Sequence, residues 1–287
     1  MHRRLHPRRN IAPNTHFYKF IVSGSHICEY GLDPNQREEA SLYLSLKKNG
    51  GVKQVEVFIP AFNLAYLVVI WAMAIAMGWR YALQPAERRR FSRWLLASVL
   101  LLALGDSFHL GTRLQRSLTG VERMALFWGG REVPWTGVGA FATSLTLTFF
   151  YLFVLIYRQE RYRLPWAWAE KAIVGLLAVR LLLLFFPQNN WGGPAPEWRI
   201  YRNVPFILAG MGVAALFLRT ARMISGPANK WLRVIGWAVV VSFVSYAGTI
   251  LLVERYPMAG ILMLPKTVAY VVAVLYFYRL EFRAPPA

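Results

Sequence analysis

The sequence predicts an all-α membrane protein, a bundle of seven transmembrane helices. Of its 287 residues, 56% are hydrophobic and only 16% are charged, whereas a soluble domain carries about 25% charged residues. Apolar runs of about 20 residues, the length that crosses a bilayer, recur from residue 61 onward. Aromatic, arginine and proline residues stand at most of their ends, as expected at a membrane–water interface.

Residues 1–54 differ in composition from the transmembrane domain predicted for residues 55–287. They contain nine Lys/Arg and four Asp/Glu, and no apolar run long enough to span a membrane or to serve as a signal peptide. One interpretation is a disordered basic tail. A second is that translation starts near Val55, because the codons of an upstream glycine pair can form a ribosome-binding sequence and no methionine lies between Met1 and Met73.

The membrane-spanning helices are taken in chain order from the apolar runs. Their ends are placed where aromatic or basic residues interrupt the run, and the fifth is the shortest. The seven predicted segments are about 62–79, 93–113, 135–157, 165–187, 203–219, 232–253 and 258–279.

The distribution of basic residues predicts the orientation, because cytoplasmic loops carry an excess of Lys and Arg. The loops after segments 1, 3 and 5 and the C-terminal tail hold fourteen: Arg80, Arg88, Arg89, Arg90, Arg93, Arg158, Arg161, Arg163, Arg219, Arg222, Lys230, Arg233, Arg279 and Arg283. The other side holds seven: Arg113, Arg116, Arg123, Arg131, Arg199, Arg202 and Arg255. The chain is therefore predicted to be N-out and C-in.

The net charge of +19 is typical of loops that face anionic lipid, because the basic residues cluster between apolar runs. We therefore expect membrane lipids as partners and no nucleic acid, and we expect the bacterial cytoplasmic (plasma) membrane as the location. The single cysteine, Cys28, allows neither a disulfide framework nor a thiolate metal site.

Three polar residues of the second segment are predicted to share one helix face. Asp106, His109 and Arg113 follow an i, i+3, i+7 spacing. A charged residue inside a spanning helix is costly unless it is paired or hydrated, so it indicates a functional site. His109 is also able to change its charge near neutral pH.

Most other intramembrane polar residues are predicted to lie at the same depth, in the outward-facing half. A shared polar pocket open to the outer face would produce this clustering, and its net positive charge would attract an anion or a lipid headgroup. The predicted ligand-binding residues are Asp106, His109, Arg113, Arg180, Asn189, Asn190, Arg202, Asn203, Tyr246, Glu254, Lys266 and Tyr270.

Pro265 is predicted to lie inside the seventh segment, where it would remove one backbone hydrogen bond and free the carbonyl of Ile261. Lys266 follows it directly. Purely structural explanations stand beside the pocket: Asp106 and Lys266 could form an interhelical ion pair that sets the register, and Arg180 and Arg202 could extend to the outer headgroups.

Five short runs carry a resemblance to known sequences. They are Gly105-Asp106-Ser107-Phe108-His109, Thr143–Tyr151, Pro187–Trp191, Arg202–Phe206 and Leu262–Thr267. Over about residues 90–280 the chain resembles a family of uncharacterised bacterial seven-helix membrane proteins. The resemblance implies a bacterial inner-membrane protein and no particular activity.

Better-known seven-helix families fit less well. Zinc-dependent ceramidase-like and adiponectin-receptor-like hydrolases need several histidines, whereas His109 is alone in the spans, so no metal site is predicted. Retinal proteins carry a Schiff-base lysine in the seventh helix. Lys266 occupies the seventh segment, but its surroundings do not resemble theirs, so no cofactor is expected.

Three functions remain open. The first is a receptor, binding protein or transporter for a small anionic or amphipathic ligand, in which Asp106 and Lys266 form a gating pair and His109 senses pH. The second is a lipid-modifying membrane enzyme that uses Asp106 and His109 for acid–base chemistry, with Ser107 or water as nucleophile. The third is a structural or assembly role.

Overall fold

The computed structural model describes residues 51–283, apart from the side chains of residues 51–57 and 257. The predictions for residues 1–54 therefore fall almost wholly outside the described residues. The described residues from 59 onward belong to one compact unit, which is the subject of the description below. The helices are α3 (Gly51–Ala82), α4 (Ala86–Thr119), α5 (Trp135–Tyr162), α6 (Trp168–Leu184), α7 (Pro196–Met223), α8 (Pro227–Leu252) and α9 (Met263–Glu281), with short 3-10 helices η1 (Pro187–Asn189) and η2 (Pro257–Leu262) and strands β1 (Met124–Trp128) and β2 (Arg131–Pro134).

Six helices in this part of the chain are long and apolar enough to cross a membrane. They are Phe58–Ala82, Ala86–Thr119, Trp135–Tyr162, Pro196–Met223, Pro227–Leu252 and Met258–Glu281. The chain is thus an all-α, multi-pass membrane protein. Helix α6 has 17 residues, or roughly 25 Å at 1.5 Å per residue, somewhat less than the ~30 Å of a hydrocarbon core.

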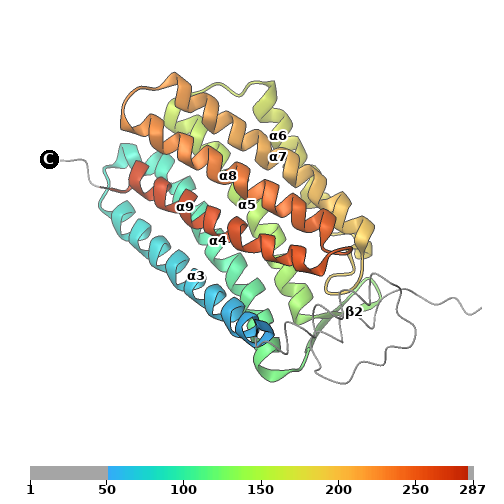
Figure 1. The fold of residues 1–287 in the computed structure, drawn as a ribbon. Helices are drawn as coiled ribbons and strands as arrows, with labels where there is room; N and C mark the ends of the chain where they lie inside the picture. Colours follow the sequence, from blue (N-terminus) through green and yellow to red (C-terminus); the bar gives the residue numbers. More distant parts are fainter. Residues whose placement is uncertain (1–50, 284–287) are drawn as a thin grey trace, which may run out of the picture. The chain divides into compact units, whose positions relative to one another are not determined.

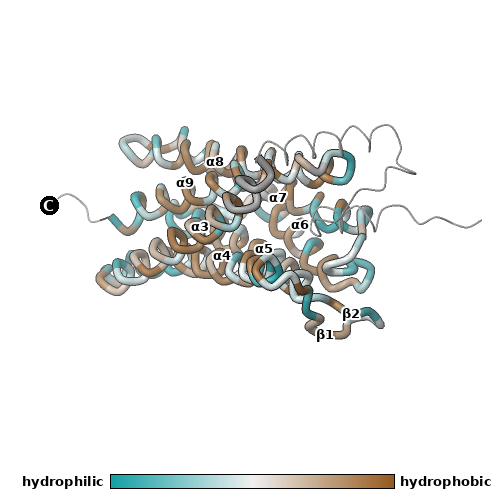
Figure 2. The backbone as a smooth tube through the Cα atoms, turned by 60° about the horizontal axis from the view of Figure 1, so that its bottom comes forward, coloured by the Kyte–Doolittle hydropathy of each residue, from teal (hydrophilic) through white to brown (hydrophobic). Residues whose placement is uncertain are grey.

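The helices pack in an order that follows the chain. Each of α4 to α8 contacts the next helix, and α9 also contacts α4. Figure 1 shows them lying side by side with alternating directions, and Figure 2 shows hydrophobic residues along their lengths and hydrophilic residues at several of their ends. We call the end with β1, β2, η1 and η2 the hairpin end, and the end where α5 and α9 finish the opposite end.

The β-hairpin between α4 and α5 was not predicted. Its two-residue turn is Gly129-Gly130, and both glycines have positive φ angles, 58° and 76°, as the favoured hairpin turns require. Trp128 packs edge-on against Phe141 of α5 with ring centroids 5.1 Å apart. The hairpin is thereby held against the bundle at the hairpin end.

The observed helices are longer than several predicted segments. α7 begins at Pro196 rather than 203, and α4 begins at Ala86 rather than 93. Hydropathy detects only the part of a helix suited to hydrocarbon, whereas the helix itself continues into the polar interface.

The expected helix break at Pro265 is wrong. The regular helix α9 begins at Met263 after the 3-10 turn η2, so Pro265 lies in its first turn. Proline is tolerated there, because the first backbone N–H groups of a helix lack an intrahelical partner in any case. No interior hydrogen bond is therefore lost at this position.

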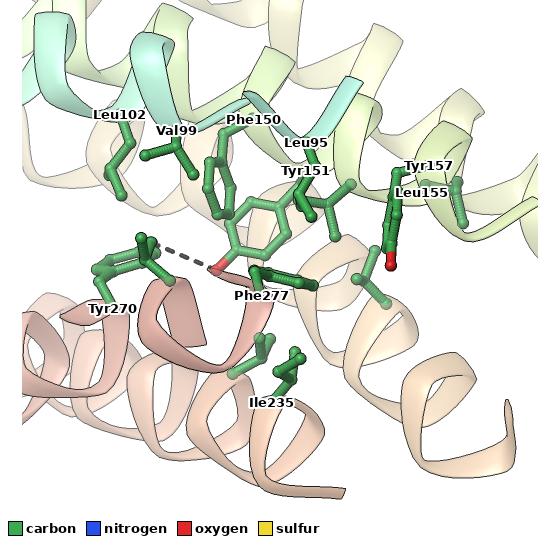
Figure 3. Close-up of a cluster of buried hydrophobic side chains, with 14 of the residues drawn as sticks. Leu95, Val99, Leu102, Phe150, Tyr151, Leu155, Tyr157, Ile235, Tyr270 and Phe277 are labelled. Carbon is green, nitrogen blue, oxygen red and sulfur yellow. Dashed lines mark hydrogen bonds between the residues drawn. The ribbon is translucent and has the colours of Figure 1, made fainter. Parts of the chain in front are cut away.

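The centre of the bundle is a continuous apolar core that contains several aromatic rings. Tyr151 and Tyr270 face one another across this core, with 3.4 Å between their hydroxyl oxygens (Figure 3). Helices α4 and α5 approach closely at Gly105, where an added Cβ would lie 1.8 Å from Oγ1 of Thr146. This close approach brings Asp106 within reach of α5.

Candidate functional site

Asp106 lies on α4 between two neighbouring helices. One carboxylate oxygen accepts a short hydrogen bond from the Tyr66 hydroxyl of α3, and the other accepts from Thr143 Oγ1 of α5 at 2.9 Å. No basic group of the described chain lies within 4.0 Å of this carboxylate. The predicted direct pair with Lys266 is therefore not formed, although the two charges are near enough to interact electrostatically.

The Ser107 hydroxyl makes two hydrogen bonds, one within its own helix α4 and one with α3. Its hydroxyl donates to the Ala103 carbonyl at 2.7 Å and accepts from Trp71 Nε1 at 2.9 Å. A hydroxyl whose proton is given to a backbone carbonyl is not poised to be activated by a base. The structure thus offers no support for Ser107 as a nucleophile.

His109 lies one turn along α4 from Asp106. Its Nδ1 is buried and has no hydrogen-bond partner among the described residues. The charged groups that act on its ring are Arg113, further along α4, and Lys266 of α9. A buried polar atom without a partner is uncommon and needs an explanation, such as an unseen water or ligand.

Lys266 is surrounded by aromatic rings rather than by carboxylates. Its ammonium nitrogen lies 4.4 Å from the ring centroid of Tyr246 and 5.8 Å from that of Tyr270. Such cation–π contacts are worth about 0.5–2 kcal/mol, which does not replace a counter-charge. At the start of α9, Lys266 therefore has no carboxylate in direct contact among the described residues, and the Asp106 charge acts on it only from beyond ion-pair distance.

Arg180 is the most deeply buried charge in the predicted set. Its side chain is 1% exposed and stacks on Phe206, with 3.3 Å from Cζ to the ring centroid. One Nη donates to the Ser144 carbonyl at 3.5 Å, and Nε and the other Nη have no partner in residues 51–283. Arg180 does not extend to the headgroups, so that explanation is wrong for this residue.

Arg202 is better satisfied than Arg180. It donates to the Asn189 side-chain oxygen at 3.0 Å and lies over the Trp191 ring at 4.2 Å. The Asn189 amide in turn donates to the carbonyls of Leu183 and Phe186 at the end of α6. These contacts terminate α6 and fasten it to α7, which is a structural role.

A hydrogen bond between Tyr246 and Asn203 joins α8 to α7 close to Arg202. The Tyr246 hydroxyl donates to Asn203 Oδ1 at 2.8 Å, and the Asn203 amide donates to the Arg199 carbonyl at 2.8 Å. Arg199 also pairs with Glu254 at 2.7 Å, and the Glu254 side chain is 51% exposed. Glu254 therefore lies at the rim of the bundle and is not part of the buried cluster.

Two further predicted residues lie apart from the cluster. Asn190 has a left-handed backbone (φ 43°) and bonds the Pro194 carbonyl within its own loop, so it shapes that loop. Arg113 is exposed on α4 and lies outside the buried group, although its charge acts on His109 and Lys266. The residues that the structure does bring together, here called the cation cluster, are Asp106, His109, Arg180, Tyr246, Lys266 and Tyr270.

A second buried polar group lies at the opposite end and was missed by the sequence reasoning. Arg158 donates to Thr220 Oγ1 at 2.8 Å and to Glu170 at 3.1 Å, as well as to its neighbour Gln159. The signal was available: Glu170 is an acid beside a strongly basic loop. The predicted third segment ends at residue 157, so hydropathy alone places Arg158 in the loop that follows.

Glu281, near the end of α9, is a second buried acid that links neighbouring helices through hydrogen bonds. It accepts from the Tyr157 hydroxyl at 2.7 Å and from Arg161 Nε at 2.6 Å, and the Gln84 amide donates to its backbone carbonyl at 2.7 Å. These contacts hold α5, α9 and the turn after α3 together.

No protein-family model matches the chain, and comparisons with curated proteins and with solved structures find no match either. The resemblance drawn from the sequence therefore stays a prediction. Within residues 51–283 no group of three or more His, Cys, Asp or Glu side chains is placed to hold a metal ion.

Proposed function

We propose that the cation cluster binds a small anion, or the anionic group of an amphipathic molecule, inside a seven-helix protein of the bacterial cytoplasmic membrane. The observation that carries this proposal is Arg180, whose guanidinium is buried with two of its nitrogens unpartnered. A buried charge is tolerable only when it is paired and hydrogen-bonded. A carboxylate or phosphate would supply both.

The charge balance of the cluster supports an anion rather than a cation. Arg180 and Lys266 are two fixed positive charges, and Asp106 is the one fixed negative charge among the cluster residues. Asp106 is already engaged by two hydroxyl donors. The available hydrogen-bond capacity therefore belongs to donors, which are what an oxyanion requires.

Aromatic side chains shape the surroundings for an amphipathic ligand. Phe206 covers one face of the Arg180 guanidinium, while Tyr246 and Tyr270 lie beside the Lys266 ammonium. Sites of this kind, apolar with a few convergent polar groups, are typical of small-molecule binding. The enzyme alternative gains less support, because among the described contacts Asp106 bonds to Tyr66 and Thr143 and not to His109.

Thermal unfolding of the purified full-length chain in detergent tests the proposal. Inorganic phosphate, short-chain carboxylates and anionic detergents would be titrated against wild type, Arg180→Gln and Arg116→Gln. Arg116 is the matched control, since it is a more exposed arginine near the hairpin end that is already paired with Glu122 at 3.0 Å. A ligand at about 100 times its Kd stabilises a protein by about 2.7 kcal/mol.

We expect at least one anion to stabilise wild type and Arg116→Gln and to lose its effect on Arg180→Gln. If no anion stabilises the wild type, or if it stabilises all three proteins equally, the cation cluster is a structural feature and the binding proposal fails.

The orientation belongs to the same proposal and has its own test. If the 17-residue α6 crosses the membrane as the seventh helix, the fourteen-to-seven excess of basic residues supports a cytoplasmic C-terminus. A fluorescent-protein fusion after residue 283 should fluoresce, and an alkaline phosphatase fusion there should be inactive. The reverse result would move the cation cluster to the cytoplasmic half.

A further inference from the structure

A long groove runs between α8 and α9 on the outside of the bundle. It has a volume of about 740 Å³ and is lined by ten residues, eight of them apolar and two basic. Its floor contains Ala238 and Ala269, which are 8% and 6% exposed, and its walls include Trp237 and Val268, which are 58% and 49% exposed. Small residues on the floor and large ones on the walls give the groove its depth.

The groove follows the helix axes. Lys230 lies in the first turn of α8, at the opposite end, and Pro265 lies in the first turn of α9, at the hairpin end. The eight residues from Lys230 to Ala238 rise about 12 Å, and the four from Ala269 to Pro265 rise about 6 Å. A groove of roughly 18 Å exceeds half of the ~30 Å hydrocarbon core.

The two basic residues lie together at one extremity of the groove. Lys230 and Arg233 are both exposed, and neither lies within 4.0 Å of a carboxylate in the part of the chain that the structure describes. Arg233 donates through Nε and one Nη to Asn229 Oδ1, which orients its guanidinium. The groove is therefore apolar along its length and cationic at one end.

We propose that this groove binds one acyl chain of an anionic glycerophospholipid, with the lipid phosphate at Lys230 and Arg233. The groove's apolar lining matches an acyl chain, and its cationic extremity matches an anionic headgroup. The charge complementarity distinguishes this occupant from a neutral lipid. The site is separate from the cation cluster, so it does not depend on the proposed function.

Fluorescence quenching by brominated lipid tests the proposal, because Trp237 lines the groove. The full-length protein would be reconstituted into vesicles of phosphatidylcholine containing either dibrominated phosphatidylglycerol or dibrominated phosphatidylcholine at equal fractions. The emission of Trp237 is obtained as the difference between wild type and Trp237→Phe. We expect phosphatidylglycerol to quench this emission at a several-fold lower fraction than phosphatidylcholine does.

The double variant Lys230→Gln/Arg233→Gln should remove the preference. Arg219→Gln/Arg222→Gln is the matched control, because these two exposed arginines lie near the same end on α7 and should leave the preference unchanged. Val268→Trp, which fills the groove at an exposed position, should reduce quenching by both lipids.

Equal quenching by the two lipids would overturn the proposal, as would a preference that survives Lys230→Gln/Arg233→Gln. The mass of the protein in nanodiscs or detergent would identify a competing occupant. A wild-type dimer that Val268→Trp converts to monomer would assign the groove to a second copy of the chain instead.

Discussion

The two ends of the bundle each bury an arginine, and they treat it differently. Arg158 at the opposite end is 3% exposed and donates to Thr220, Gln159 and Glu170. Arg180 toward the hairpin end is 1% exposed and has an aromatic ring and one long hydrogen bond. Two arginines are thus buried to a similar degree. Arg158 is neutralised by Glu170, whereas Arg180 has no carboxylate within 4.0 Å among the described residues.

This difference separates a structural network from a candidate binding site. The Arg158–Glu170 ion pair neutralises its own charge and fixes neighbouring helices, although the second Glu170 carboxylate oxygen has no hydrogen-bond partner among the described residues. An unsaturated cation costs stability, so its presence is explained more readily by a ligand than by the fold. Substitutions at Arg158 and at Arg180 test the two roles separately.

The largest expected effect is at the opposite end. Glu170→Leu removes the acid that neutralises Arg158 and should destabilise the protein by roughly 3–5 kcal/mol, because a buried charge then lacks its partner. Thermal unfolding in detergent measures the loss. Arg158→Met added to Glu170→Leu should recover much of the lost stability, and a single variant as stable as wild type would show that the network is not structural.

The next effect concerns the partner of Asp106. The hydrogen bond from Tyr66 predicts a coupling of about 1.5–3 kcal/mol, the usual range for a bond to a charged group. A double-mutant cycle with Tyr66→Phe and Asp106→Asn would measure it. A parallel cycle with Lys266→Met should give a smaller coupling, because Lys266 is not in contact with Asp106. If the Lys266 coupling were larger, the ion-pair interpretation would be restored.

A smaller effect is expected for Arg180 without ligand. Arg180→Met removes an unsatisfied buried charge, so it should leave stability unchanged or raise it by about 1 kcal/mol, whereas Arg158→Met should lower it. The two variants are matched in chemistry and burial and would be compared by unfolding in anion-free detergent. Equal destabilisation would mean that Arg180 is as structural as Arg158.

The sequence predicted an all-helical membrane protein, and six of the described helices are long and apolar enough to cross a membrane, but it predicted the contacts between helices poorly for a physical reason. Apolar length identifies a crossing helix, and helical spacing identifies the shared face of Asp106 and His109. Neither tells how one helix is rotated against the next. The rotation of α4 relative to α3 places Asp106 within hydrogen-bonding distance of Tyr66, which lies 40 residues earlier in the sequence.

The opposite-end network illustrates the same limit. Gln84 meets Glu281 across 197 residues of sequence, and nothing local in either residue's neighbourhood indicates it. The hairpin was easier to find in principle, because the Gly129-Gly130 pair that follows the apolar run Met124–Trp128 is a turn signal. Its strands have five and four residues, far fewer than the ~20 apolar residues by which hydropathy identifies a spanning helix.

The smallest expected effect is the pH dependence of anion binding at the hairpin end. His109 carries no hydrogen-bond partner on Nδ1 among the described residues, and the charges that act on it are Arg113 and Lys266. A proton taken up by the imidazole adds positive charge to a site that binds an anion.

By linkage, affinity for the anion should therefore rise as pH falls, and the bound anion should in turn favour the protonated ring. We expect a change of at most about tenfold, or ~1.4 kcal/mol, confined to the acid end of the range of about pH 5–8 in which histidine ordinarily titrates, because burial and the two neighbouring cations oppose protonation of the ring. His109→Gln should flatten the profile while Arg180-dependent binding remains. Affinity that falls with acidification in the wild type, or a slope unchanged in His109→Gln, would remove His109 from the binding site and leave Arg180 and Lys266 as its cations.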